Sequence, residues 1–134
     1  MRRMWIAGAA IALIAGCASG LKKPVHEVTA TVSADSVQHV TVVAHSFWFD
    51  PNRVVVKRGL PVEFTLKNGG MFVPHGFDCE GKDAGIEIHV GAGMFRGSGK
   101  MRFTPTLVGE YAFHCGVDGH AKKGMKGTLV VVEP

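Results

Sequence analysis

The sequence predicts an all-β domain, and two observations carry this prediction. Short stretches in which apolar and polar residues alternate recur along residues 36–134, with turn residues roughly every ten positions. No window repeats apolar residues at helical spacing, and the 18 glycines of the chain would destabilise helices. The pattern therefore favours a β-sandwich or a small Greek-key barrel of about seven to eight strands.

The first expected strand begins near Ser36, where Val40, Val42 and Ala44 share one face, and it continues through the aromatic run 47–49 to a turn at Asp50. Each later strand is bounded by a Gly, Pro or Asn turn signal. We expect these later strands at residues 54–57, 62–67, 86–90, 101–103, 110–115 and 127–133.

Residues 1–16 have the pattern of an export signal. Two arginines precede an apolar run over residues 4–14, which is too short to span a bilayer comfortably. The segment ends in Ile-Ala-Gly-Cys at residues 14–17, which resembles the bacterial lipobox, where a cysteine after small residues becomes the acylated N-terminus. We expect lipidation at Cys17, with ordinary cleavage after Ala15 or Ala18 as the alternative.

Residues 17–35 are small and polar and show no sustained period, so we expect the acylated cysteine to be followed by a flexible tether. The folded domain would then occupy residues 36–134. A lipoprotein of this kind would lie at the periplasmic face of the bacterial cell envelope. Ala18 is not the Asp that retains lipoproteins at the inner membrane, so the outer membrane is slightly favoured.

The charge of the chain gives little reason to expect a nucleic-acid partner. The net charge of +4 falls to +2 once Arg2 and Arg3 leave with the signal, because all 11 acidic residues lie at Glu27 or later. No run of basic residues is longer than two. We therefore expect no nucleic acid, and we expect a monomer.

Four residues are candidate metal ligands. Cys115, His120 and Met125 follow one another at five-residue spacing through the last loop, and His75 lies in an earlier one. A thiolate, imidazoles and a thioether are soft ligands that select copper over hard cations. In the strand 110–115, Cys115 shares a face with two aromatic residues, so its sulfur should point into an apolar core.

Residues 47–70, 74–77 and 111–132 resemble the cupredoxin (plastocyanin/azurin-like) family across essentially all of residues 36–134. The resemblance implies an eight-stranded Greek-key β-sandwich that holds one copper ion. It implies that His75, Cys115 and His120 are trigonal ligands and that Met125 is a long axial ligand. Four residues separate Cys115 from His120, nearer to azurin than to plastocyanin-like members, in which two residues separate the corresponding ligands, so the resemblance leaves blue, green and red copper open.

The same resemblance implies an electron carrier rather than an enzyme, and the lipobox would tether it to a membrane. Its partner would be a redox protein such as a cytochrome or an oxidase, reached through the loop around His120. Lys122, Lys123 and Lys126 surround His120 in sequence and would dock onto an acidic face of that partner, with an ordinary solvated loop as the alternative. One alternative is a copper-binding module for copper delivery, sequestration or sensing. A second is a single-domain copper protein with an open coordination site and enzyme-like activity.

His114 and Cys79 are two further residues that could take part in the site. His114 points away from Cys115 by strand parity; the alternative is that it binds a second copper, as the neighbour of the ligand cysteine does in copper nitrite reductases. Cys79 is expected to be a free, partly buried thiol, although a metal-linked role or a disulfide with Cys115 in the copper-free protein are alternatives. A water-excluding shell is expected from residues Phe72, Phe77, Phe113 and Val117.

Overall fold

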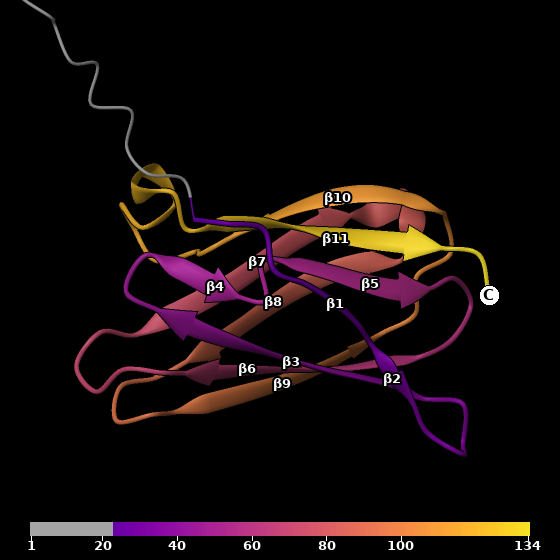
Figure 1. The fold of residues 1–134 in the computed structure, drawn as a ribbon, viewed down its shortest axis with the longest axis horizontal. Coiled ribbons are helices and arrows are strands. Elements are labelled where there is room, and N and C mark those ends of the chain that lie inside the picture. The colour runs from indigo at the N-terminus through magenta and orange to yellow at the C-terminus, as the bar shows by residue number, and fades with distance from the viewer. Residues whose placement is uncertain (1–22) are drawn as a thin grey trace, which may run out of the picture.

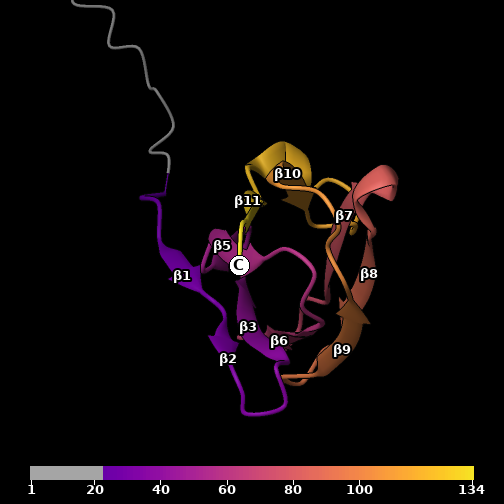
Figure 2. The ribbon, with the colours of Figure 1, turned by 90° about the vertical axis from the view of Figure 1, so that its right-hand side faces the viewer.

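Two β-sheets pack face to face in the computed structural model, which describes residues 23–134 (Figure 1, Figure 2). The export signal and Cys17 lie outside the described residues. The part of the chain that is described contains eleven strands and two short 3₁₀ turns. None of its helices is long and apolar enough to cross a membrane.

The first sheet has the strand order β1-β5-β11-β10-β7-β8. The strand pairs β1–β5 and β5–β11 are parallel, and the other pairs are antiparallel. Its strands are β1 (Glu27–Thr29), β5 (Arg53–Lys57), β7 (His75–Gly81), β8 (Ile86–Ala92), β10 (Gly109–His114) and β11 (Lys126–Val132).

The second sheet has the order β2-β3-β6-β9, with β4 pairing to β3. The pair β3–β6 is parallel, so a hairpin cannot join these strands and the chain crosses to the other sheet between them. Its strands are β2 (Thr31–Val32), β3 (Gln38–His45), β4 (Trp48–Asp50), β6 (Val62–Asn68) and β9 (Ser98–Phe103). The two 3₁₀ turns are η1 (Lys82–Ala84) and η2 (Ala121–Lys123).

Four phenylalanines fill the centre between the sheets. The ring centroid of Phe77 lies 5.5 Å from that of Phe49, 4.4 Å from that of Phe64 and 4.3 Å from that of Phe113. Each of the four side chains is 1% exposed. Aromatic pairs at these separations stabilise a core beyond the area that they bury. Because Phe77 and Phe113 come from β7 and β10, the cluster fixes two strands that lead to the predicted metal ligands.

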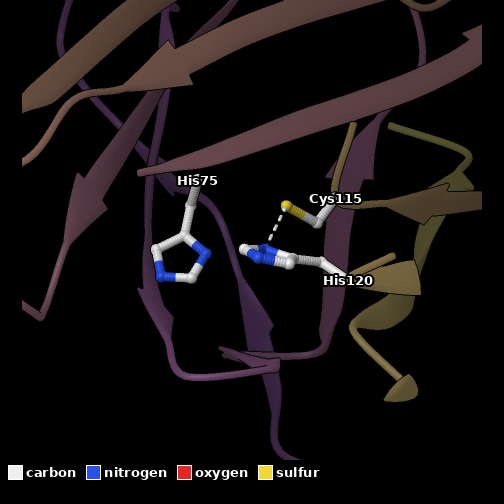
Figure 3. Close-up of side chains that lie close together, drawn as sticks. All are labelled: His75, Cys115 and His120. Carbon is white, nitrogen blue, oxygen red and sulfur yellow. Dashed lines mark hydrogen bonds between the residues drawn. The ribbon is translucent and has the colours of Figure 1, made fainter. Parts of the chain in front are cut away.

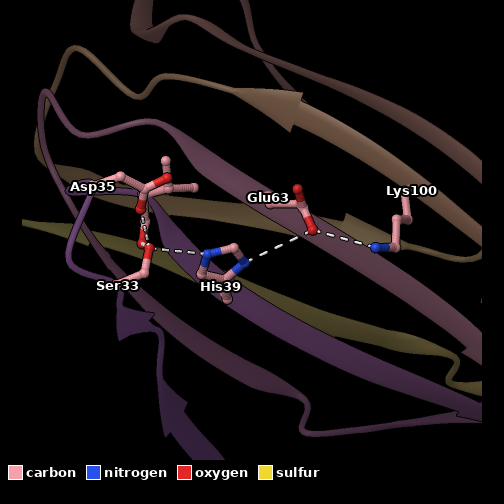
Figure 4. A network of polar contacts seen from close by, with 6 residues as sticks. Ser33, Asp35, His39, Glu63 and Lys100 are labelled. Atoms are coloured by element: carbon pink, nitrogen blue, oxygen red, sulfur yellow. Dashed lines mark hydrogen bonds and ion pairs between the residues drawn. The ribbon is translucent and has the colours of Figure 1, made fainter.

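The outer face of the second sheet carries a row of polar contacts (Figure 4). Ser33 donates to the carbonyl of Val37 at 2.8 Å and lies 3.1 Å from His39 Nε2, while Nδ1 of His39 lies 3.8 Å from Glu63. Lys100 contacts the same carboxylate at 3.3 Å. These side chains are solvated, so the row contributes little to stability and marks the wet side of the sandwich.

The first predicted strand is two strands in the structure. The chain reverses at Ser46 and Phe47, and β4 returns antiparallel to β3 with His45 opposite Trp48. The turn was missed because it carries none of the Asn-Gly or Asp-Gly signals of a two-residue hairpin. The expectation of one continuous strand through residues 47–49 was therefore wrong.

The domain also begins earlier than residue 36. Within the expected tether, β1 and β2 extend the two sheets, and Ala30 is 6% exposed and donates its N–H to the Val55 carbonyl at 2.9 Å. Strands of two or three residues are too short to show an alternating pattern. These two strands, β4 and the unpredicted β7 raise the number from the seven or eight expected to eleven.

Candidate metal centre

Strand pairing brings the predicted ligands to one end of the sandwich, and Figure 3 shows three of them, His75, Cys115 and His120. His75 is the first residue of β7, and Cys115 directly follows the last residue of β10. These strands are antiparallel neighbours, with His114 opposite Asp78, so the start of β7 meets the end of β10. His120 and Met125 lie on the loop that leads from β10 to β11, beside η2.

Three of these side chains converge. The ligand atoms of His75, Cys115 and His120 all lie within 4.8 Å of one another, and the group is the single such cluster of His, Cys, Asp or Glu in residues 23–134. The Cys115 sulfur is 3.5 Å from His120 Nδ1, and the two imidazole centroids are 5.3 Å apart. The three residues are only 3%, 1% and 8% exposed, respectively.

Backbone hydrogen bonds fix the loop that carries the other ligands. Cys115 donates its N–H to the Met125 carbonyl at 3.1 Å, and Met125 donates to the His120 carbonyl at 3.2 Å. The N–H of Gly76 donates to the Cys115 sulfur at 3.3 Å. Met125 is fully buried, so its thioether lies in the protein interior. Together with the other three residues it is arranged as a type 1 copper site.

Gly116 allows the start of the ligand loop to pass close to the neighbouring strand β7. A Cβ atom at this position would lie 2.0 Å from a carboxylate oxygen of Asp78, on the neighbouring strand β7. A side chain at this position would therefore have to displace the Asp78 carboxylate or move the residue after Cys115 away from β7. The close approach holds the sulfur beside the first residues of that strand.

The residues present fit a copper ion. Nδ1 of His75 is buried and has no hydrogen-bond partner, the single such side-chain atom in the described part of the chain. An unsatisfied buried nitrogen is costly, and a metal would satisfy it. Burial lowers the pKa of His75, helped by His120 and His45, so the imidazole is neutral and offers its lone pair. One sulfur anion and two imidazoles are soft donors of the kind that copper prefers.

The water-excluding shell is confirmed in part. Phe77 and Phe113 are each 1% exposed, and Val117 packs against the core from the ligand loop. The expectation for Phe72 was wrong, because its ring is 76% exposed. The β6–β7 loop turns Phe72 outward, where it lies 6.3 Å from Phe95 of the β8–β9 turn.

Sequence reasoning missed one aromatic residue at the site. The ring of Phe47, from the β3–β4 turn, lies 5.1 Å from the His120 ring at an interplanar angle of 85°. Lys123 places its ammonium 4.0 Å from the centre of the Phe47 ring. The aromatic run 47–49 was visible in the sequence, but only the reversal at Phe47 brings this ring to the ligand loop.

The remaining residues of interest lie apart from the cluster. His114 is exposed and faces away from Cys115 on the outer side of the sheet, opposite Asp78. Cys79 is free and fully buried, rather than partly buried, and burial raises the pKa of its thiol to about 12, with a smaller contribution from Glu80. The predicted docking lysines, 122, 123 and 126, are exposed.

Similarity to known proteins agrees with this geometry. The sequence model of a family described as the cupredoxin-like domain matches residues 6–131. The chain is 30% identical over 109 residues to the copper-resistant cuproprotein CopI of Rubrivivax gelatinosus, covering 67% of this chain and 63% of that protein. It is 32% identical over 98 residues to cytochrome c oxidase subunit 2 of Thermus thermophilus, covering 70% of this chain and 65% of that protein.

The chain thus spans a little under two thirds of the length of these two relatives. Among solved structures, auracyanin A, a "blue" copper protein from Chloroflexus aurantiacus, superposes with a TM-score of 0.59. The match covers 72% of this chain and 99% of auracyanin A, at 20% sequence identity. At that identity the likeness shows a common fold.

Proposed function

Because this chain belongs to the family of cupredoxin-like domains, we propose that it is a type 1 copper protein that shuttles single electrons between redox partners. The observation that carries the proposal is the buried sulfur of Cys115, which lies within 4.8 Å of a ligand nitrogen of each of two imidazoles. Such a ligand set is the one found in electron-transfer copper sites.

In this proposal His75, Cys115 and His120 are the three strong ligands and Met125 is the weak axial one. Bound copper supplies a one-electron couple. The chain holds the ligands in place by hydrogen bonds along the loop and by burial, so that little has to move when the electron does. Phe77 and Phe113 keep water away from the sulfur and so favour the less charged oxidation state.

The visible absorption spectrum of the oxidised, copper-loaded protein tests this function. We expect an intense band from charge transfer between the thiolate and copper(II), with one copper bound per chain. A copper-loaded protein without this band would contradict the proposal. The position of the band, blue, green or red, would report on the longer loop between Cys115 and His120.

Similarity to a copper-resistant cuproprotein favours a second candidate, a copper-binding module for copper delivery, sequestration or sensing. Such a module would release copper(I) to an acceptor at a useful rate and exchange electrons slowly. Stopped-flow measurement of electron self-exchange, beside copper(I) transfer to a chelator, separates the two functions. An open, enzyme-like site is less favoured because the four proposed ligands are at most 8% exposed; an exchangeable water on copper(II) would support it.

An exposed apolar patch near His75 suggests where a redox partner docks. It consists of Met71, Phe72 and Val73 on the β6–β7 loop and Met94 and Phe95 on the β8–β9 turn. The two segments are joined by the Phe95 N–H, which donates to the Met71 carbonyl at 2.7 Å. The first segment leads directly into His75, so the patch lies at the ligand end of the sandwich.

The charged residues at this end of the molecule indicate the charge expected on the partner. Residues 64–77 and 88–109 contain no Asp or Glu, whereas Arg96 lies within the β8–β9 turn itself. Within residues 23–134, none of Lys122, Lys123 and Lys126 forms an ion pair, so their charges are free to act on a partner. We therefore propose a cytochrome or oxidase whose apolar contact face has an acidic rim.

Salt dependence tests the docking surface. Long-range attraction is screened over a distance of about 8 Å at physiological ionic strength, so raising the salt concentration should slow second-order electron transfer to an acidic partner. Replacing Phe72 by Ser should slow the reaction at every salt concentration without changing its salt dependence. A rate that is independent of ionic strength would contradict the charge part of the proposal.

The proposed location is the bacterial envelope, with residues 1–16 as export signal and a lipid on Cys17. Because β1 begins at Glu27, the tether in this proposal is shorter than expected and ends near residue 26. Mass spectrometry of the N-terminal peptide from protein made in bacterial cells tests the anchor. A diacyl modification that is lost in Cys17→Ser is expected, and an unmodified peptide starting elsewhere would contradict it. Fractionation of the two membranes then tests the slight preference for the outer one.

A further inference from the structure

The β3–β4 turn places a bulky residue where a glycine is expected. Phe47 has a φ of +68°, in the left-handed region that side chains other than Gly and Asn rarely adopt. It is the second residue of a two-residue hairpin between His45 and Trp48, a position at which glycine would be free of strain. Strain of this kind persists only where surrounding contacts hold it, and it is often found at functional sites.

The contacts that hold Phe47 lie on the ligand loop. Its ring packs edge to face with His120, at 5.1 Å and 85°, while Lys123 approaches the same ring at 4.0 Å. Lys123 is itself tied to the loop, since its N–H donates to the His120 carbonyl at 3.0 Å. The phenyl ring of Phe47 thus contacts both the ammonium of Lys123 and the imidazole of the proposed ligand His120, and these three side chains are called the stack below.

This stack changes the expected role of His120. The sequence predicts that a partner is reached through the loop around His120; the side chain itself is only 8% exposed, and Phe47 lies against it. Within residues 23–134, the one hydrogen-bond contact of either imidazole is that of His120 Nδ1 with the Cys115 sulfur at 3.5 Å, so packing also helps to hold the rings. For His120 the packing partner comes from a turn distant in sequence.

We propose that Phe47 is a positioning residue for His120. Its ring fixes the orientation of the imidazole, keeps water from the outer side of that ligand, and holds the charge of Lys123 at a set distance above it. The inference rests on the proposed function, because it treats His120 as a copper ligand. It adds a residue outside the ligand set and outside the ligand loop.

Two physical consequences follow. Water that reaches the site stabilises the more highly charged copper(II) state, so loss of the phenyl ring should lower the reduction potential. A cation held near the site disfavours the same state, so loss of the Lys123 charge should lower the potential as well. An imidazole that is no longer packed should also rotate more freely, which speeds the release of the metal.

The test uses Phe47→Gly, a substitution that removes the ring and relieves the backbone. We expect a lower reduction potential, a changed thiolate band, and release of copper(I) to a chelator that is faster by about three- to tenfold, the range that one aromatic contact accounts for. Phe47→Tyr keeps the ring and should restore wild-type values. Lys123→Gln should lower the potential by less than Phe47→Gly, and Lys123→Arg should not.

Two control variants separate the stack from general effects. Ser36→Gly relieves a left-handed residue, φ +62°, in the turn before β3, and it should leave potential, spectrum and release rate unchanged. Lys82→Gln removes an exposed charge on η1 and should do the same. A wild-type potential and release rate in Phe47→Gly would overturn the inference.

A readout without copper keeps this inference distinct from the proposed function. In the copper-free protein, Phe47→Gly should speed hydrogen–deuterium exchange of the amides in the loop 116–125, while Ser36→Gly should not. If the wild type shows no thiolate band, the proposed function fails while loop exchange still reports on positioning. If the band is present but neither copper release nor loop exchange responds to Phe47→Gly, the positioning role is wrong.

Discussion

Cys79 and Cys115 are each 1% exposed, and each side chain points into the same core from neighbouring strands. What faces the two sulfurs differs. Cys115 has His120 Nδ1 at 3.5 Å, the N–H of Gly76 at 3.3 Å and the proposed ligand His75 in the same cluster. Cys79 lies opposite Phe113 on β10, and its thiol has a pKa raised to about 12.

The comparison shows that burial alone does not make a cysteine a ligand. A buried thiol surrounded by apolar side chains keeps its proton, because nothing there stabilises the negative sulfur. A buried sulfur with imidazoles and an N–H donor beside it can be an anion once a metal is present. The two cysteines are only two positions apart in the paired strands, because Cys115 lies opposite Phe77 and Cys79 is two residues after Phe77. That offset places Cys115 at the ligand loop and Cys79 in the apolar core.

Replacing each cysteine by serine should have opposite effects on the copper spectrum. We expect Cys115→Ser to abolish the charge-transfer band of the copper-loaded protein, because the band belongs to the thiolate. Cys79→Ser should keep the band at its wild-type wavelength. Absorption spectra of the two variants at equal copper content check this, and a band that survives in Cys115→Ser would show the ligand assignment to be wrong.

The cluster of four phenylalanines beside the two cysteines is expected to have the next largest effect. Phe77 touches Phe49, Phe64 and Phe113, so Phe77→Ala should lower the free energy of unfolding of the copper-free protein by about 3–5 kcal/mol. Chemical denaturation measures the change. Phe72→Ala is the matched control, since its ring is exposed, and it should change stability by less than about 0.5 kcal/mol. Equal losses in both variants would mean that the cluster is not the core.

The protonation of Cys79 predicts a smaller effect that depends on pH. The unfolded chain releases this proton near pH 9.0, and the folded protein holds it until about pH 12. Between these values the unfolded state binds fewer protons, so the free energy of unfolding falls as the pH rises, by roughly 1 kcal/mol per pH unit. Below pH 9 the contribution is fully present.

Cys79→Ala provides the reference for this measurement. It carries the same lysines and tyrosine as the wild type, so the difference between the two proteins isolates the thiol. We expect the wild type to lose its stability advantage between pH 9 and pH 12 in denaturation experiments. Parallel curves across that range would contradict the raised pKa.

The ligand set and its end of the fold were predictable because they depend on local order. The five-residue spacing of Cys115, His120 and Met125 lies on one loop, and strand parity alone turns Cys115 inward, as the structure confirms. The core positions Val40, Val42 and Ala44 follow from the same two-residue period and are at most 5% exposed.

The surroundings of the site were not predictable, because they depend on contacts between distant segments. Phe72 and Phe47 both lie in apolar or aromatic sequence, yet one ring points into solvent and the other packs on His120. Only the directions of two turns decide between these outcomes. The strands β1 and β2 were missed for a different reason, since they depend on pairing with β5 and β3 and have almost no pattern of their own.

The smallest expected effect is none at all, and it concerns oxidation. A disulfide between Cys79 and Cys115 in the copper-free protein requires Cα atoms about 4.4–6.8 Å apart. Cys79 is opposite Phe113, and Cys115 continues the register to lie opposite Phe77, so the two cysteines are diagonal neighbours, whose Cα atoms are typically about 7–8 Å apart. The rings of Phe77 and Phe113, 4.3 Å apart, occupy the other diagonal. Intact-mass analysis of the air-oxidised copper-free monomer should therefore show no loss of two protons. A two-proton loss that vanishes in Cys79→Ser would mean that β7 and β10 separate readily, and the contrast between the two cysteines would then be one of dynamics rather than of environment.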